Sequence, residues 1–306
     1  MKNTFESPSS PEQLVSRSYS FSLANERHPE TNEDSYFSDD KHKTYGVFDG
    51  VGGSEGGSYA SKFVANILQH YSNFQESKNP ENIEDTKNYF CEVLKYAHDR
   101  LILAREKYPQ FQEMDTTAAI VKILKTESGA VALAFSTGDS RVYSFRSNRK
   151  PPLVLHTLDD GVIKQKYMEA PSARKDAVST KEDAVEDARE KAMKAQEYFD
   201  YLQRTPTDPV EADLFERRNL ISNSIGILRD VRDVEVSVID VQDGDILLLT
   251  TDGIHDPLTK QEISDTISKN IRSLHLIPQS LVLKANRVSG FRRKLDDRTA
   301  VVVKIG

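Results

Sequence analysis

Short apolar runs and alternating apolar and polar positions fill two blocks of the chain, and both patterns predict β-strands. In the N-terminal block, apolar and polar residues alternate from Arg17 to Leu23, and a strand-like run extends from Lys43 to Phe48. A strand-like segment at 35–37 lies between them. Further runs bounded by turn residues predict strands at 116–124, 130–137, 141–145, 152–157, 234–241, 245–251 and 299–305.

Apolar residues recur every three or four positions between these strands, which is the spacing of an amphipathic helix. This spacing predicts helices at 60–71 and after Pro80, and two more at 259–272 and 277–288. The stripe expected to be buried in the second helix is Phe90, Val93, Leu94, Ala97, Leu101 and Ala104. Five glycines between positions 50 and 57 predict a loop. Because strands and helices come in blocks without regular alternation, we expect an α+β fold, with antiparallel sheets and helices packed outside them.

A charged segment, 160–218, separates the two β blocks. Its alanine-rich centre, 179–204, predicts one long helix with a heptad-like apolar stripe. The stripe consists of Val185, Ala188, Ala192, Ala195, Phe199 and Leu202, and the favourable i,i+4 ion pairs are Asp187–Lys191 and Glu190–Lys194. The helix either rests this small apolar face on its own domain or binds a partner such as a second copy. Alanines make a weak seam, so we favour the first interpretation. Pro206 is expected to end the helix, and Pro209 to keep the next stretch extended.

Composition excludes several classes of protein. The 306 residues include 41 Lys and Arg against 48 Asp and Glu, a net charge of −7, which argues against a nucleic-acid partner. The single cysteine, Cys91, excludes an internal disulfide framework and suits a reducing compartment, so a cytoplasmic protein is expected. No apolar run approaches the ~20 residues of a membrane span, so no membrane partner is expected. Residues 1–16 predict a loose arm, and 17–306 a single domain with an insertion at about 160–218.

Acidic residues fall where predicted strands begin or end: Glu33, Asp34, Asp49, Asp139, Asp252, Asp296 and Asp297. If the sheets stack, these strand ends converge at one edge. Convergent carboxylates repel one another and stay ionised together only beside cations. Oxygen ligands without thiolates or paired histidines favour Mg²⁺ or Mn²⁺ over zinc. Two such ions can activate a water molecule and neutralise a phosphate. Each Asp-Gly pair alone is an ordinary turn, so the inference depends on the whole set.

Seven segments in this order resemble the PPM-type, or type 2C, metal-dependent Ser/Thr protein phosphatases, in particular bacterial members. They are NEDSYF (32–37), GVFDGVGG (46–53), TTAAIV (116–121), STGDSRVY (136–143), RNLISNSIG (218–226), LLLTTDGIHD (247–256) and LDDRTAVVV (295–303). The resemblance implies two stacked antiparallel sheets flanked by helices, an α/β/β/α sandwich. It also implies that segment 160–218 replaces the mobile flap beside the substrate cleft and enlarges it with a long helix.

The resemblance further implies a site with two metal ions and a weaker third. The implied metal ligands are Glu33, Asp49, the carbonyl of Gly50, Asp139, Asp252 and Asp296. Asp49 would bridge the two ions, Asp34 would hold water bound to them, and Asp139 would serve the third. A hydroxide bridging the ions would attack the phosphorus in line, without a phosphoenzyme.

Three positions depart from the family pattern. Asp115 stands where a glycine is common, and there we expect a backbone adjustment without loss of a metal ligand. Val51 stands where eukaryotic members often carry a histidine, although bacterial relatives often have an apolar residue there. Pro29 stands where members usually carry a phosphate-binding arginine. Arg27 lies two residues earlier, and its fork-shaped guanidinium is our candidate replacement.

Two functions are carried forward. The first is a Mg²⁺- or Mn²⁺-dependent phosphatase that hydrolyses phosphoserine and phosphothreonine in a protein substrate, with a Ser/Thr kinase as one candidate counterpart. The alternative is a weak or inactive phosphatase-like scaffold that binds partners through its long flap helix. The complete set of acidic ligands favours catalysis. We expect a monomer, with dimerisation through 179–204 as the alternative.

Overall fold

The computed structural model describes residues 15–74, 82–127, 129–169, 181–204, 208–228 and 234–306. Most of the predicted arm, 1–16, lies outside the described residues. The first strand begins at Ser16, inside the range predicted as arm, and Ser16 is paired with Ile305.

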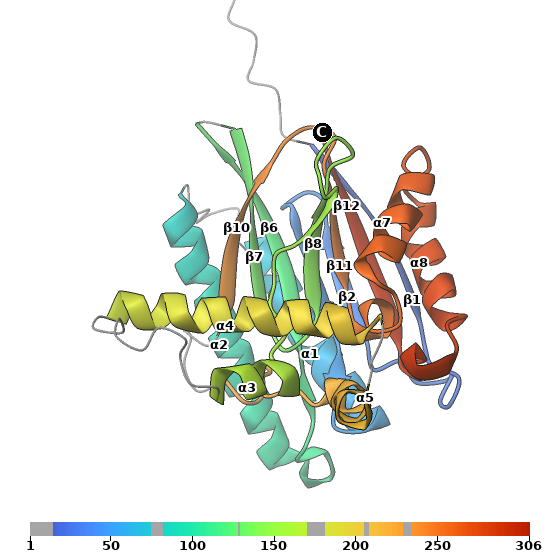
Figure 1. Cartoon of the computed structure of the whole chain (residues 1–306). Coiled ribbons are helices and arrows are strands. Elements are labelled where there is room, and N and C mark those ends of the chain that lie inside the picture. Colours follow the sequence, from blue (N-terminus) through green and yellow to red (C-terminus); the bar gives the residue numbers. More distant parts are fainter. Residues whose placement is uncertain (1–14, 75–81, 128, 170–180, 205–207, 229–233) are drawn as a thin grey trace, which may run out of the picture.

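Two five-stranded antiparallel sheets form the centre of the fold (Figure 1). In order across the first sheet lie β1 (Ser16–Leu23), β12 (Arg298–Ile305), β11 (Ile246–Thr250), β8 (Arg141–Phe145) and β9 (Leu153–Leu155). Across the second lie β10 (Glu235–Val241), β7 (Gly129–Thr137), β6 (Ala118–Thr126), β3 (Thr44–Phe48) and β2 (Ser35–Asp39). A short ladder joins β4 (Gly50–Val51) to β5 (Asp115–Thr116). The predicted strands are therefore present.

Side chains alternate along the strands so that both faces of each sheet are buried. On β12, Val301 and Val303 pack between the two sheets, whereas Ala300 and Val302 face the outer helices. The helices outside the second sheet are α1 (Ser54–Phe74) and α2 (Ile83–Lys107), and those outside the first are α7 (Lys260–Lys269) and α8 (Leu276–Asn286). The predicted stripe of α2 is buried throughout. The predicted α/β/β/α sandwich is confirmed.

The glycine segment is more ordered than the sequence suggested. Gly50 belongs to strand β4, and Gly57 lies in the first turns of α1, so the prediction of a loop over 50–57 is wrong at both ends. The reason is a close backbone approach, because a Cβ on Gly50 would overlap the carbonyl of Gly57. Glycine is needed here to bring the start of α1 against the strand end that carries Asp49.

The predicted long helix is α4 (Lys181–Leu202), and most of its stripe packs against its own chain. Ala192, Ala195, Phe199 and Leu202 are buried, whereas Val185 near the other end is 69% exposed. Phe199 and Leu202 contact α3 (Val162–Glu169) and α5 (Pro209–Glu216) in one hydrophobic cluster. Figure 1 shows α4, in yellow, crossing the lower part of the strands above these two helices. The favoured interpretation, a helix resting on its own domain, therefore holds for these four side chains.

The two predicted ion pairs of α4 are present, at 3.3 Å for Asp187–Lys191 and 2.8 Å for Glu190–Lys194. The predicted end of the helix near Pro206 lies outside the described residues.

Pro209 begins a helix, and the expectation of an extended stretch there is wrong. The Asp208 carboxylate caps α5 by accepting the backbone N–H groups of Val210 and Glu211, at 2.8 and 3.0 Å. Proline is well suited to the first helical position because no backbone N–H is needed there. The signal was the Asp-Pro pair, which reads as a cap followed by the first helical residue.

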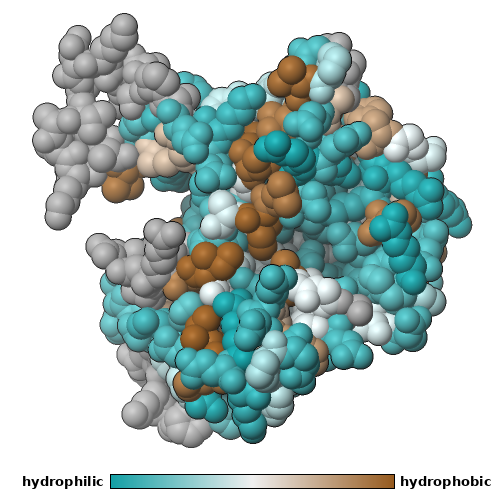
Figure 2. Space-filling model, turned by 90° about the horizontal axis from the view of Figure 1, so that it is seen from below, coloured by the Kyte–Doolittle hydropathy of each residue, from teal (hydrophilic) through white to brown (hydrophobic). Residues whose placement is uncertain are grey.

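The lower side of the molecule, where α3 and α5 lie, carries hydrophobic side chains in a broken band among hydrophilic ones (Figure 2). Exposed apolar residues of these elements include Met168 of α3 and Val210 of α5. Across the described ranges, no helix is long and apolar enough to cross a lipid bilayer.

Candidate active site

The predicted acidic residues lie at one end of the sandwich, where strands of both sheets begin or end. Glu33 and Asp34 precede β2, Asp49 follows β3, Asp139 precedes β8, Asp252 begins the short helix α6 (Asp252–His255) after β11, and Asp296 precedes β12. Two contacts tie the sheets together here. The Thr251 hydroxyl donates to Asp34 Oδ2 at 2.7 Å, and the Glu33 backbone N–H donates to Asp297 Oδ2 at 2.5 Å.

Asp49 is held in place by hydrogen bonds of its own backbone N–H and carbonyl groups. Its N–H donates to the Thr117 hydroxyl at 3.0 Å, and its carbonyl accepts the Thr117 N–H and the Thr116 hydroxyl, both at 2.9 Å. Burial raises the pKa of the Asp49 carboxyl well above its usual range, and the charges of Asp252 and Asp34 raise it further. The charges of these neighbouring acids therefore act on Asp49, and a cation would stabilise its ionised form.

Asp252 has a similar environment but also contacts a cation. Burial raises the pKa of Asp252 to about 7, although the Lys294 ammonium acts in the opposite direction. Lys294 donates a short hydrogen bond to Asp252 Oδ2 and another, of 2.9 Å, to Asp256 Oδ2. The second oxygen of Asp252, Oδ1, is buried and has no hydrogen-bond partner among the described residues. Asp34 Oδ1 is buried and unpartnered in the same way.

The Glu33 carboxylate and the Gly50 carbonyl approach the same point from different elements. A Cβ placed on Gly57 would overlap Glu33 Oε2 and lie 2.8 Å from the Gly50 carbonyl oxygen. The missing side chain of Gly57 thus leaves room between two oxygen ligands. Burial also raises the pKa of Glu33, and the nearby Asp297 charge adds to the effect.

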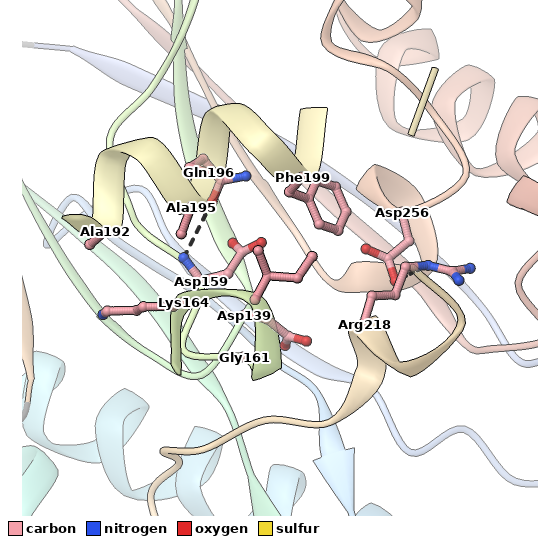
Figure 3. A pocket seen from close by; sticks show the side chains of 11 residues that line it. Asp139, Asp159, Gly161, Lys164, Ala192, Ala195, Gln196, Phe199, Arg218 and Asp256 are labelled. Atoms are coloured by element: carbon pink, nitrogen blue, oxygen red, sulfur yellow. Dashed lines mark hydrogen bonds and ion pairs between the residues drawn. The ribbon is translucent and has the colours of Figure 1, made fainter. Parts of the chain in front are cut away.

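Asp139 lies where the site meets the flap. It lines a cavity of about 20 Å³ together with Asp256 and with Ala195 and Phe199 of α4 (Figure 3). Burial raises the pKa of the Asp139 carboxyl, and the neighbouring Asp252 charge raises it further. The cavity has room for about one water molecule, so it is not the place where a substrate side chain enters.

Arg27 is not in contact with these acids in the described structure. Its side chain is exposed, and only its backbone N–H forms a hydrogen bond, to Asn25 Oδ1 at 2.8 Å. His28, which sequence reasoning passed over, is nearer: its Nε2 lies 3.7 Å from Glu33 Oε1. A hydrogen bond from His28 Nδ1 to the Thr31 carbonyl raises the imidazole pKa.

The donor set fits hard divalent cations. Every candidate ligand offers oxygen, two buried carboxylate oxygens lack partners, and the Gly57 gap separates two more oxygens. Among the described residues, however, no three acidic, histidine or cysteine side chains lie close enough together to ligate one metal ion. The positive charge among them comes from Lys294.

No protein-family model and no curated protein matches the sequence. Solved structures do match. The serine/threonine phosphatase Stp1 from Staphylococcus aureus has a TM-score of 0.68 at 18% identity, covering 100% of both chains. The PPM Ser-Thr phosphatase MsPP from Mycobacterium smegmatis, solved in complex with cacodylate, has a TM-score of 0.65 at 20% identity. The match covers 96% of this chain and 100% of MsPP. The catalytic domain of the serine/threonine phosphatase PstP, solved with two manganese ions, has a TM-score of 0.67 at 20% identity. The match covers 96% of this chain and 99% of the PstP chain.

The chain has the PPM phosphatase fold. The resemblance inferred from seven short segments is thus confirmed at the level of the fold, over nearly the whole chain. At identities of 18–20%, the similarity to these structures establishes the fold and assigns no role to single residues.

Two residues beside this site make contacts that the sequence did not indicate. Asp115 stands where PPM-fold sequences often have glycine, and it accepts hydrogen bonds from Ser224 and from the Gly226 N–H, the latter at 2.5 Å. Asp115 therefore holds the segment that follows the flap against the short ladder next to Asp49. Lys294 was missed because a lysine two residues before an Asp-Asp pair ordinarily reads as a solvated loop residue.

Proposed function

We propose that this chain is a Mg²⁺- or Mn²⁺-dependent phosphatase that hydrolyses phosphoserine and phosphothreonine in proteins. The observation that carries the proposal is the convergence of buried carboxylates from both sheets at one end of a PPM fold, with two carboxylate oxygens left unpartnered in the described structure.

The proposed ligand roles are those that the resemblance to PPM phosphatases implies. Asp49 stands among the acids of both sheets and would bridge two ions. Glu33 and the Gly50 carbonyl would complete one ion's ligands, and Asp252 and Asp296 the other's. Asp139, at the edge of the flap, would hold a weaker third ion. When bound, the ions would neutralise the phosphate and lower the pKa of a water molecule for attack on phosphorus.

The chain's own residues orient the reactants. Thr251 fixes one oxygen of Asp34, which leaves Oδ1 to accept a hydrogen bond from water. Asp297 fixes the Glu33 backbone, so the acidic pair cannot move independently of β12. Arg27, on the loop that leads to Glu33, is proposed to bind the substrate phosphate after a change of rotamer.

One observation favours the alternative, a weakly active scaffold. The Lys294 ammonium contacts Asp252 and Asp256, so part of the repulsion among these carboxylates is offset without a metal. In this alternative the exposed part of α4, which includes Val185 and Met193, would bind a partner. A Ser/Thr kinase counterpart, a monomeric state and a cytoplasmic location stay predictions, as does the division into an arm and a single domain.

The deciding experiment measures hydrolysis of p-nitrophenyl phosphate with Mn²⁺, with Mg²⁺ and with EDTA. We expect turnover with either metal and none with EDTA, and a loss of roughly 100-fold or more in kcat for Asp49→Asn. The matched control is Asp240→Asn, because Asp240 is an exposed acid on β10. Metal-independent turnover, or full activity of Asp49→Asn, would refute the proposed site. Phosphopeptides in place of the small ester then test the substrate class.

A further inference from the structure

Lys294 is a buried cation in the middle of the acidic site. The residue is 9% exposed, and its ammonium contacts Asp252, Asp256 at 2.9 Å and Asp296 at 3.5 Å. Two of these three acids, Asp252 and Asp296, are proposed ligands of the same ion. The lysine therefore contacts the same two carboxylates that this ion would use, through Oδ2 of each.

The loop that carries Lys294 is held in place independently of the acids. Its backbone carbonyl accepts a hydrogen bond of 2.7 Å from the Arg298 guanidinium. Two residues earlier, Arg292 forms an ion pair of 2.6 Å with Glu262 on α7. The ammonium is thus delivered by an anchored segment and is not a surface side chain folded inward by chance.

The third partner, Asp256, is an acid that Lys294 can contact whether or not a metal is bound. Asp256 also receives Arg218 from the flap, at 3.1 Å (Figure 3). Asp256 is not among the proposed metal ligands. Lys294 can therefore keep its hydrogen bond to Asp256 while it releases Asp252 and Asp296.

We propose that Lys294 is a tethered counter-ion that competes with the divalent cation for Asp252 and Asp296. It stabilises these carboxylates in the metal-free protein, and it weakens one of the two metal sites because like charges repel at this distance. This inference rests on the proposed metal site. It assigns to this chain an intrinsic cation that sets metal affinity, and Lys294 acts as a positioning residue and not as a catalytic one.

Isothermal titration with Mn²⁺ tests the proposal without any measurement of activity. We expect Lys294→Met to bind Mn²⁺ at one site about tenfold or more tighter than the wild type, with the other site changed less. Lys294→Arg keeps the charge and should keep the weaker affinity. In EDTA, Lys294→Met should unfold at a lower temperature than the wild type, because three acids lose their counter-ion.

Lys122→Met is the matched control. Lys122 is also buried, at 4% exposure, but it donates to the His42 carbonyl near the start of β3, at the opposite end of that strand from Asp49. The Lys122→Met variant should be less stable than the wild type and should bind Mn²⁺ with unchanged affinity. If Lys294→Met bound Mn²⁺ no tighter than the wild type, or bound inorganic phosphate less tightly at unchanged Mn²⁺ affinity, the proposal would be wrong. If the wild type and Lys294→Met both bound no Mn²⁺, the proposed function itself would fail, and with it the basis for a competing cation.

Discussion

The guanidinium of Arg27 stands in solvent on the loop that leads from β1 to Glu33 and Asp34, and the described structure gives it no side-chain partner. A free arginine on this loop can reach a bound phosphate dianion through two parallel hydrogen bonds. Arg27→Ala should therefore raise the KM for p-nitrophenyl phosphate by about three- to tenfold and leave kcat nearly unchanged. Arg100→Ala, which removes another exposed arginine on α2, is the control and should change neither. An unaltered KM for Arg27→Ala would show that another group binds the phosphate.

The positions of single acids could be predicted because each interrupts an apolar strand pattern. Asp49 and Asp252 were identified in this way, and the structure places them at the same end of the sandwich. Lys294 could not be found by the same reasoning. Its burial depends on acids that approach from α6 and from its own loop, and no local pattern in the sequence encodes that approach.

Helix α4 is the long helix of the flap, and Phe199 is one of the buried residues that anchor it. The ring is 5% exposed, lies 5.9 Å from the Phe215 ring, and has the buried Arg141 guanidinium 4.6 Å from its centre. Phe199→Ala should lower the free energy of unfolding by about 3 kcal/mol, because it leaves a cavity and removes a cation–π contact. Urea denaturation measures the change. Val185→Ala on the exposed end of the same helix is the control, and a comparable loss there would contradict the packing described.

Elements with a strong apolar periodicity were predicted well. The errors lie where contacts between backbone groups, or a helix cap, determine where an element begins. The stripe of α2 is a local property of the sequence, so it could be read directly. The start of α1 depends on Gly57 meeting Gly50, which are neighbours only after folding. The helix at Pro209 depends on a cap from Asp208, a signal that was present in the sequence but was given less weight than the proline.

At the scale of the whole molecule, the two sheets meet at a layer of acids, and this layer opposes folding when no metal is bound. Hydrophobic contacts of both sheets hold the layer together, while burial and mutual repulsion raise the pKa values of Asp34, Asp49 and Asp139. The site therefore stores unfavourable electrostatic energy that a cation can relieve. Stability, pH and metal binding should consequently be linked in this protein.

Asp252 allows this linkage to be tested with a defined sign. Its pKa rises from 3.8 to about 7 on folding, so the folded state binds the extra proton between these values. The stability that this proton provides is present at low pH and is lost as the pH rises through about 7. In EDTA, Asp252→Asn, which is neutral at every pH, should therefore exceed the wild type in stability by on the order of 2 kcal/mol at pH 8 and much less at pH 5.

Mn²⁺ should reverse this order at pH 8, because the ion binds the ionised carboxylate and the asparagine variant lacks it. Thermal unfolding of both proteins at the two pH values, with EDTA and with Mn²⁺, gives the comparison. Asp265→Asn serves as the control, since Asp265 is an exposed acid on α7 and is not among the proposed ligands. If the wild type instead gained stability over Asp252→Asn as the pH rose in EDTA, folding would not raise the pKa of Asp252, and the Lys294 ammonium would outweigh the effect of burial.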